Sequence, residues 1–90
     1  MKITLFQNET GEVTTEWFQL DRDGRNVYCY GDFGGATVKL QTSPDKNEAF
    51  DEAEHTFTVK GKARLYSSPG VWVRGTISGG TNRNITLIVV

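Results

Sequence analysis

Apolar and polar residues alternate with a period of two along most of this 90-residue chain. Such alternation is typical of half-buried β-strands, whereas the apolar positions of a helix recur every three to four residues. The alternating runs are short, and glycine, asparagine, aspartate or proline separates them at intervals of about 8–12 residues. The pattern therefore predicts an all-β protein with about eight antiparallel strands.

The expected elements follow from these runs and from the turn residues between them. Strands are predicted around Ile3 and Leu5, at residues 14–20, 26–30 and 36–41, around Phe50, and at residues 56–59, 63–66, 71–77 and 85–90. Turns are predicted at residues 8–11, 21–24 and 44–47, in the acidic stretch after Phe50, at Gly61, and at residues 67–70, with a loop at 78–84. We expect one antiparallel β-sandwich or jelly-roll-like domain over residues 1–90. The predicted core comprises Leu5, Val38, Leu40, Phe57, Val59, Leu65, Val71, Val73, Ile85 and Leu87.

Two apolar segments indicate contacts beyond a simple half-buried strand. The final run ITLIVV is apolar on both faces, so it is either a central strand covered on both sides or a strand with one face against another molecule. In the run VWVR at residues 71–74, alternation places Trp72 and Arg74 together on the face opposite the two valines. Trp17 and Phe18 are adjacent and must point to opposite faces, so one of them is expected outside the core.

Composition limits how this small chain can be stabilised and what it can bind. A single cysteine, Cys29, excludes an internal disulfide and is expected as a buried core thiol, which leaves association with another chain as a source of stability. The net charge is −1 and the basic residues are scattered along the sequence, so no nucleic-acid partner is expected. No apolar run is long enough for a membrane helix, and the start does not resemble a signal peptide, so we expect assembly in a cytoplasm.

The pair Gly34-Gly35 raises the question of a phosphate-binding loop. Such loops connect a strand to the N-terminus of a helix, within a longer glycine pattern. Here strand residues follow the pair, and neither the G-x-G-x-x-G pattern nor the Walker pattern is present. The pair is therefore predicted to be a turn between strands.

No catalytic or metal-binding constellation emerges from the remaining polar residues. Residues 21–26, DRDGRN, have a partial likeness to a calcium loop, but the glycine comes too early, and a hairpin turn is expected. The acidic residues near the middle of the chain are expected to be a solvated loop or a contact with arginines of a partner; they are Asp45, Glu48, Asp51, Glu52 and Glu54. His55 has no ligand or nucleophile at a suitable spacing and is predicted to be an exposed or half-exposed turn residue. We therefore expect no enzyme activity, no cofactor and no metal.

Two blocks of sequence, GDFGGATVKLQTSPD at residues 31–45 and PGVWVRGTISGGT at residues 69–81, resemble a group of short virion proteins of tailed bacteriophages. The likeness extends over residues 31–90, about two thirds of the chain, and departs from the group at Lys46-Asn47, where a glycine pair is common, and at Phe50, where a tryptophan is common. Members of the group are similar to capsid decoration, or cement, proteins. The resemblance implies a non-enzymatic structural protein on the capsid surface of a virion, bound to the major capsid protein or to other virion proteins, and forming a dimer or trimer in some cases.

Exposed aromatic residues are the expected contacts to such a partner, because tryptophan, tyrosine and arginine dominate interface energetics. The predicted interface residues are Trp17, Tyr30, Tyr66, Trp72, Arg74, Ile88 and Val90. Aromatic side chains on a sheet face also stack on sugars. A carbohydrate-binding or other accessory module of a tail or host-attachment apparatus is therefore the alternative hypothesis.

Overall fold

A computed structural model describes residues 2–21, 25–66 and 69–90 of the chain. Across these residues it contains nine β-strands and no helix, so the all-β prediction is confirmed. The strands are β1 (Ile3–Glu9), β2 (Val13–Thr14), β3 (Phe18–Gln19), β4 (Arg25–Asp32), β5 (Thr37–Ser43), β6 (Phe50–Phe57), β7 (Gly61–Leu65), β8 (Trp72–Ser78) and β9 (Asn84–Val89).

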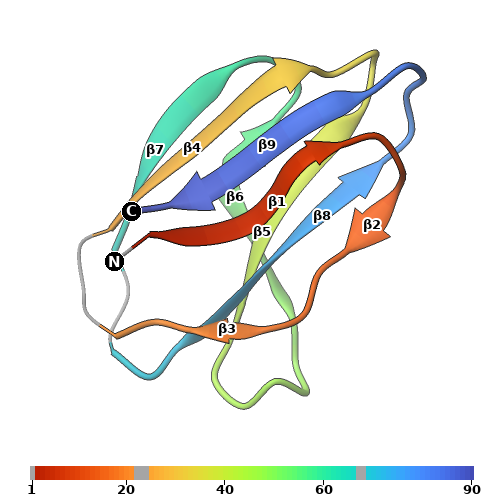
Figure 1. Cartoon of the computed structure of the whole chain (residues 1–90). Coiled ribbons are helices and arrows are strands. Elements are labelled where there is room, and N and C mark those ends of the chain that lie inside the picture. The colour runs from red at the N-terminus through yellow and green to blue at the C-terminus, as the bar shows by residue number, and fades with distance from the viewer. Residues whose placement is uncertain (1, 22–24, 67–68) are drawn as a thin grey trace.

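The strands form two antiparallel sheets packed as two layers (Figure 1). One sheet has the order β1-β9-β4-β7, and the other has the order β2-β8-β5-β6 with β3 also paired to β8. Because β2 and β3 follow one another along the same edge of β8, they fill one strand position, and the nine strands fill eight positions. Counted in this way the sheets have the orders 1-8-3-6 and 2-7-4-5, which is the jelly-roll topology. The predicted β-sandwich or jelly-roll-like fold is therefore confirmed.

The core lies between the sheets and is made of the inward-facing side chains of both. Most of the predicted core residues are buried there: Leu5, Val38, Leu40, Phe57, Leu65, Val73, Ile85 and Leu87. The prediction is wrong for Val59, because β6 ends at Phe57 and Val59 lies in the following turn with 70% of its surface exposed. Val71 precedes β8 and is only half-buried.

An irregularity in β1 brings two neighbouring residues into the core. The register of β1 on β9 shifts between Thr4 and Phe6, and both Leu5 and Phe6 are buried. A bulge of this kind breaks the strict inward–outward alternation. Gly75 on β8 accommodates the extra ring, since a Cβ atom there would lie 2.8 Å from Phe6 Cε2 and 2.7 Å from Leu87 Cδ2.

Several predicted boundaries differ from those in the structure. The strand expected at residues 14–20 is interrupted, giving the short pieces β2 and β3. The acidic turn expected after Phe50 is instead part of the continuous strand β6, and Gly61 begins β7 instead of forming a turn. The predicted turn at 21–24 falls largely, and that at 67–70 partly, on residues outside the described ones.

The final strand β9 lies in the middle of its sheet, between β1 and β4 (Figure 1). Ile85, Leu87 and Val89 face the core and are buried, while the outward-facing Ile88 remains half-buried. This central position explains why the sequence of the strand is apolar on both faces.

Candidate functional site

The pair Gly34-Gly35, which could have been a phosphate loop, instead packs against a second glycine pair, Gly79-Gly80. The amide N–H of Thr81 donates to the carbonyl of Gly34 over 2.9 Å, which joins the β4–β5 turn to the β8–β9 loop. A Cβ atom on Gly34 would lie 1.7 Å from the carbonyl oxygen of Thr81, and one on Gly80 would lie 2.6 Å from the amide nitrogen of Ala36. The glycines therefore allow two backbones to approach closely, and the prediction of a strand-to-strand turn is confirmed.

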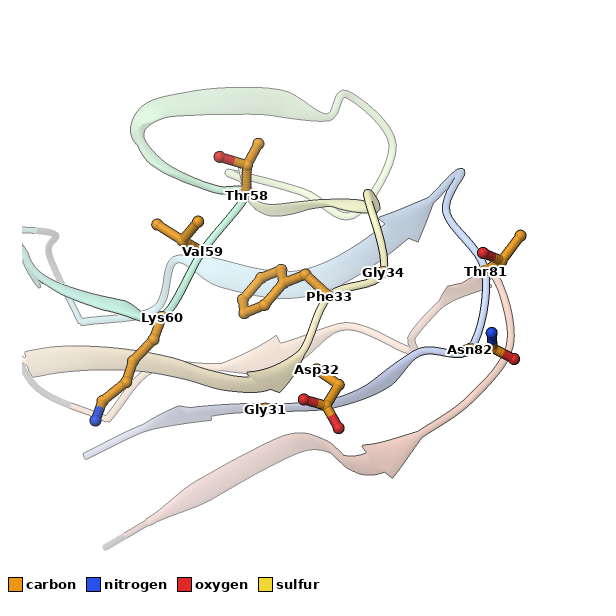
Figure 2. Close-up of a pocket in the computed structure, with 9 residues that line it drawn as sticks. All are labelled: Gly31, Asp32, Phe33, Gly34, Thr58, Val59, Lys60, Thr81 and Asn82. Atoms are coloured by element: carbon orange, nitrogen blue, oxygen red, sulfur yellow. The ribbon is translucent and has the colours of Figure 1, made fainter.

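A shallow hollow of about 540 Å³ lies at this end of the sandwich, between the β4–β5, β6–β7 and β8–β9 connections (Figure 2). Figure 2 shows Phe33 at its centre, with Val59 on one side and Gly34 and Thr81 on the other. The ring of Phe33 is buried and closes this end of the core. The hollow is open, and its polar residues, such as Asp32 and Asn82, are exposed. The hollow thus marks the place where three loops meet over the core.

The predicted interface residues separate onto the outer faces of the two sheets. Trp17, Trp72 and Arg74 lie on the outer side of the sheet that contains β8. Tyr30, Ile88 and Val90 lie on the outer side of the sheet that contains β4, and Tyr66 directly follows its edge strand β7. The structure therefore divides the predicted interface into two opposite surfaces.

We call the first surface the tryptophan face and define it by Trp17, Gln41, Trp72 and Arg74. The guanidinium carbon of Arg74 lies 4.4 Å from the centre of the Trp17 ring, a cation–π geometry. Arg74 Nε also donates to Gln41 Oε1 on the neighbouring strand over 2.8 Å. Three segments of chain are thereby joined across the outside of the sheet.

Thr15 and β8 hold Trp17 in position for this contact. The amide of Thr15 donates to the carbonyl of Gly75 over 3.0 Å, and the amide of Gly75 donates to Thr15 Oγ1 over 3.0 Å. Phe18, the next residue after Trp17, faces the other way and packs against the core. The prediction that only one of these two aromatic residues belongs to the core is confirmed.

The polar network continues from the tryptophan face toward the edge strand β6. Asp51 accepts hydrogen bonds from Gln41 Nε2 over 2.7 Å and from Lys39 Nζ over 3.3 Å. The bond from Gln41, and then the bond and charge of Lys39, hold the pKa of Asp51 below its usual value. Glu52 accepts a hydrogen bond from Thr42 over 2.7 Å. The prediction of a solvated acidic loop therefore holds for Asp45 and Glu48, which lie in the exposed turn after β5, but not for Asp51 and Glu52, which lie on β6 and are bonded within the chain.

Trp72 lies at the other end of the tryptophan face, beside the turn that follows β5. Lys46 Nζ is 4.5 Å from the centre of the Trp72 ring. Asp45 orders this turn by accepting hydrogen bonds from the amides of Asn47 and Glu48, and these bonds lower its pKa. Trp72 and Arg74 are both half-buried and lie on the face opposite the buried Val73, as the alternation predicted.

The second surface, which we call the tyrosine face, is the outer side of the β1-β9-β4-β7 sheet. Tyr28 and Tyr30 both point outward from β4, with 37% and 44% of their surface exposed. Tyr66 is 78% exposed, and the guanidinium carbon of Arg64 lies 5.8 Å from the centre of its ring. The same alternation that selected Tyr30 could have identified Tyr28, two residues earlier. By contrast, no local signal in the sequence predicted that Gln41 would bond to Arg74, because that contact depends on strand register.

Buried polar and sulfur-containing residues lie away from both faces. His55 is buried on β6 with its Nε2 atom 3.1 Å from the carbonyl oxygen of Arg64, so the prediction of an exposed turn residue is wrong. Arg25 is fully buried and forms an ion pair with Asp21, whereas the sequence placed both in or beside a hairpin turn. Cys29 is a buried core thiol, as predicted, and burial raises its pKa to about 12.

Among the described residues, no cluster of three or more histidine, cysteine or acidic side chains could hold a metal ion. Over the same parts of the chain, no helix has the length and apolar character needed to cross a membrane. No model of a known protein family matches the sequence, and no curated protein matches it. The fold and its two outer faces are therefore the basis for inferring a function.

Proposed function

We propose that this chain is a non-enzymatic structural protein of a bacteriophage virion, a capsid decoration or cement protein that binds on or between major capsid subunits. The resemblance of residues 31–45 and 69–81 to short phage virion proteins supports this proposal. The two blocks meet in the fold, where the Thr81 amide donates to the Gly34 carbonyl. The jelly roll is also a topology used by viral capsid domains, although folds alone do not determine function.

The tryptophan face is the observation that carries the proposal, and it forms the docking surface. It combines two tryptophans with an arginine, residue types that supply most of the binding energy at protein interfaces. The Arg74 side chain is already held by Gln41 and stacked on Trp17 before any partner arrives. Docking therefore costs less side-chain ordering than it would with mobile side chains.

A cement role follows from repetition of this contact. Binding across a seam between two capsid subunits buries surface on both of them. An interface of moderate area is enough to stabilise the shell when every capsid subunit carries one. On a symmetric shell the small gain of each copy is multiplied over the whole particle. The chain acts on the virion surface, as a monomer or as a dimer or trimer.

The test is the copy number of the chain in purified particles of the virus that encodes it. Quantitative mass spectrometry should give a simple ratio to the major capsid protein, corresponding to many tens of copies or more. Recombinant protein should also bind particles that lack it, and Trp72→Ala should reduce that binding. The control Thr58→Ala changes an exposed residue at the opposite end of the molecule and should bind normally. Absence from the particle would overturn the proposal.

A carbohydrate-binding module is the second candidate, because Trp17 and Trp72 share one sheet face and aromatic rings stack on sugars. However, Arg74 covers one face of the Trp17 ring and Lys46 covers one face of the Trp72 ring. These cations occupy surface that a stacked sugar would need, which favours a protein partner. Binding on a glycan array that is lost in Trp72→Ala, together with only a few copies per particle, would favour the carbohydrate-binding module instead.

A further inference from the structure

A groove runs along the tyrosine face between strands β4 and β7. It consists of two adjoining hollows of about 360 and 280 Å³, and both are lined by Tyr28 and Lys62. Tyr30 and Lys60 extend the groove toward one end, and Asn26 and Arg64 extend it toward the other. This groove lies on the opposite side of the sandwich from the tryptophan face.

Strand register gives the groove one aromatic wall and one basic wall. Tyr28 pairs with Lys62, and Asn26 pairs with Arg64, across the β4–β7 ladder. Residues two apart on a strand point to the same side and lie about 6.5–7 Å apart, so Lys62 and Arg64 project from β7 side by side. Lys60 lies just before the start of the same strand.

The charge of the groove contrasts with that of the whole chain. Three basic side chains line the two hollows, and no carboxylate does so among the described residues. The full sequence has a net charge of −1. The fold has therefore collected basic residues that are scattered along the sequence, and several acidic residues, such as Asp51 and Glu52, lie on the other sheet.

We propose that this groove binds an extended acidic segment of another protein. Carboxylates would pair with Lys60, Lys62 and Arg64, and the intervening side chains would pack on Tyr28 and Tyr30. Charge complementarity of this kind gives specificity and orientation, and the tyrosines supply apolar contact. The inference does not depend on the tryptophan face, but two opposite binding faces would let one copy join two partners.

Two observations narrow the kind of occupant: one concerns where it lies on the sheet, and the other concerns its chemical class. The Arg64 carbonyl on β7 is already engaged by His55 Nε2 at 3.1 Å, so this part of the strand edge does not accept an added strand. Single-stranded nucleic acid needs a basic groove that follows many phosphates, and affinity rises with the number that it neutralises. Three cations on a chain of net charge −1 fit a short acidic peptide better.

The test is direct binding of a fluorescein-labelled ten-residue peptide in which glutamate alternates with threonine and valine. Fluorescence anisotropy at low salt should show saturable binding to the full chain. Lys62→Gln should weaken it about two- to fivefold, the range expected for an exposed ion pair. The matched control Lys39→Gln removes the same charge from the opposite sheet and should change binding by less than about twofold. Tyr28→Ala should weaken binding more than Lys62→Gln does.

A second measurement on the unmodified protein keeps the test independent of variant stability. In an NMR titration with the same peptide, the amide signals of residues 26–30 and 60–66 should shift, and those of residues 39–41 and 72–76 should not. The proposal would be overturned by no saturable binding up to about 1 mM peptide, by equal binding of a peptide with lysine in place of glutamate, or by shifts confined to the tryptophan face. Tighter binding of a ten-nucleotide oligothymidylate than of the acidic peptide would also overturn it.

Discussion

Replacing Gly34 with alanine should destabilise the fold far more than the same replacement at Gly79. Both residues have the left-handed backbone conformation, with φ of 59° and 73°. They differ in their surroundings, because a Cβ atom on Gly34 would lie 1.7 Å from the Thr81 carbonyl oxygen, whereas one on Gly79 would have nothing within 4 Å. The pair of variants therefore separates backbone conformation from close packing of the two loops.

The expected free energies follow from these contacts. Left-handed conformation costs an alanine about 1–2 kcal/mol, and this is the whole expected loss for Gly79→Ala. Gly34→Ala carries the same cost, together with about 1–3 kcal/mol for overpacking and about 1 kcal/mol for weakening the 2.9 Å bond from the Thr81 amide. We therefore expect a loss of about 3–6 kcal/mol at Gly34.

Urea unfolding followed by tryptophan fluorescence measures both values. For a domain of this size each kcal/mol also corresponds to about 4–8 °C in the midpoint of thermal unfolding. A Gly34→Ala chain that does not fold, beside a folded Gly79→Ala chain, is consistent with the same reasoning. Equal losses at the two positions would refute the close approach of the glycine loops.

Three further predictions concern the tryptophan face and the titratable groups. Unfolding of Trp17→Ala, Arg74→Ala and the double variant should give a coupling energy of about 0.5–1 kcal/mol, and strictly additive losses would contradict the stack. Because folding lowers the pKa of Asp45 and Asp51 from an unfolded value of about 3.9, their contribution to stability is complete above that pH and is lost as pH falls through the folded values. The Asp45→Asn, Asp51→Asn double variant should accordingly lose less stability between about pH 5 and pH 2 than the unmodified chain, and parallel pH profiles would argue against these bonds. Burial raises the pKa of Cys29 to about 12, so a thiol-specific reagent at neutral pH should label it only in denaturant; rapid labelling of the native chain would show that the thiol is accessible.

Alternation predicted the orientation of side chains best where a strand is regular and one face is covered. Val73 is buried while Trp72 and Arg74 face outward, as their positions in the sequence indicated. The prediction failed at His55 and Val59, in the region where β6 ends and the chain crosses to β7. Residues 56–59 alternate past the end of β6, so alternation placed Val59 in the core although the strand ends at Phe57. The turn expected after Phe50 placed His55 outside the strand that contains it, because nothing local in the acidic stretch marks it as part of a continuous strand.

The sequence pattern alone predicts the class of structure, because a period of two and frequent turn residues leave few alternatives to a sandwich of short strands. It also determined that Trp72 and Arg74 share an outer face. The stacking of Arg74 on Trp17 and the position of Lys62 beside Tyr28 become visible only in the folded chain. The physical reason is that alternation specifies whether a side chain points inward or outward, whereas its neighbour on the next strand depends on strand order and register. Those are set by contacts between residues far apart in the chain, and they leave no local pattern.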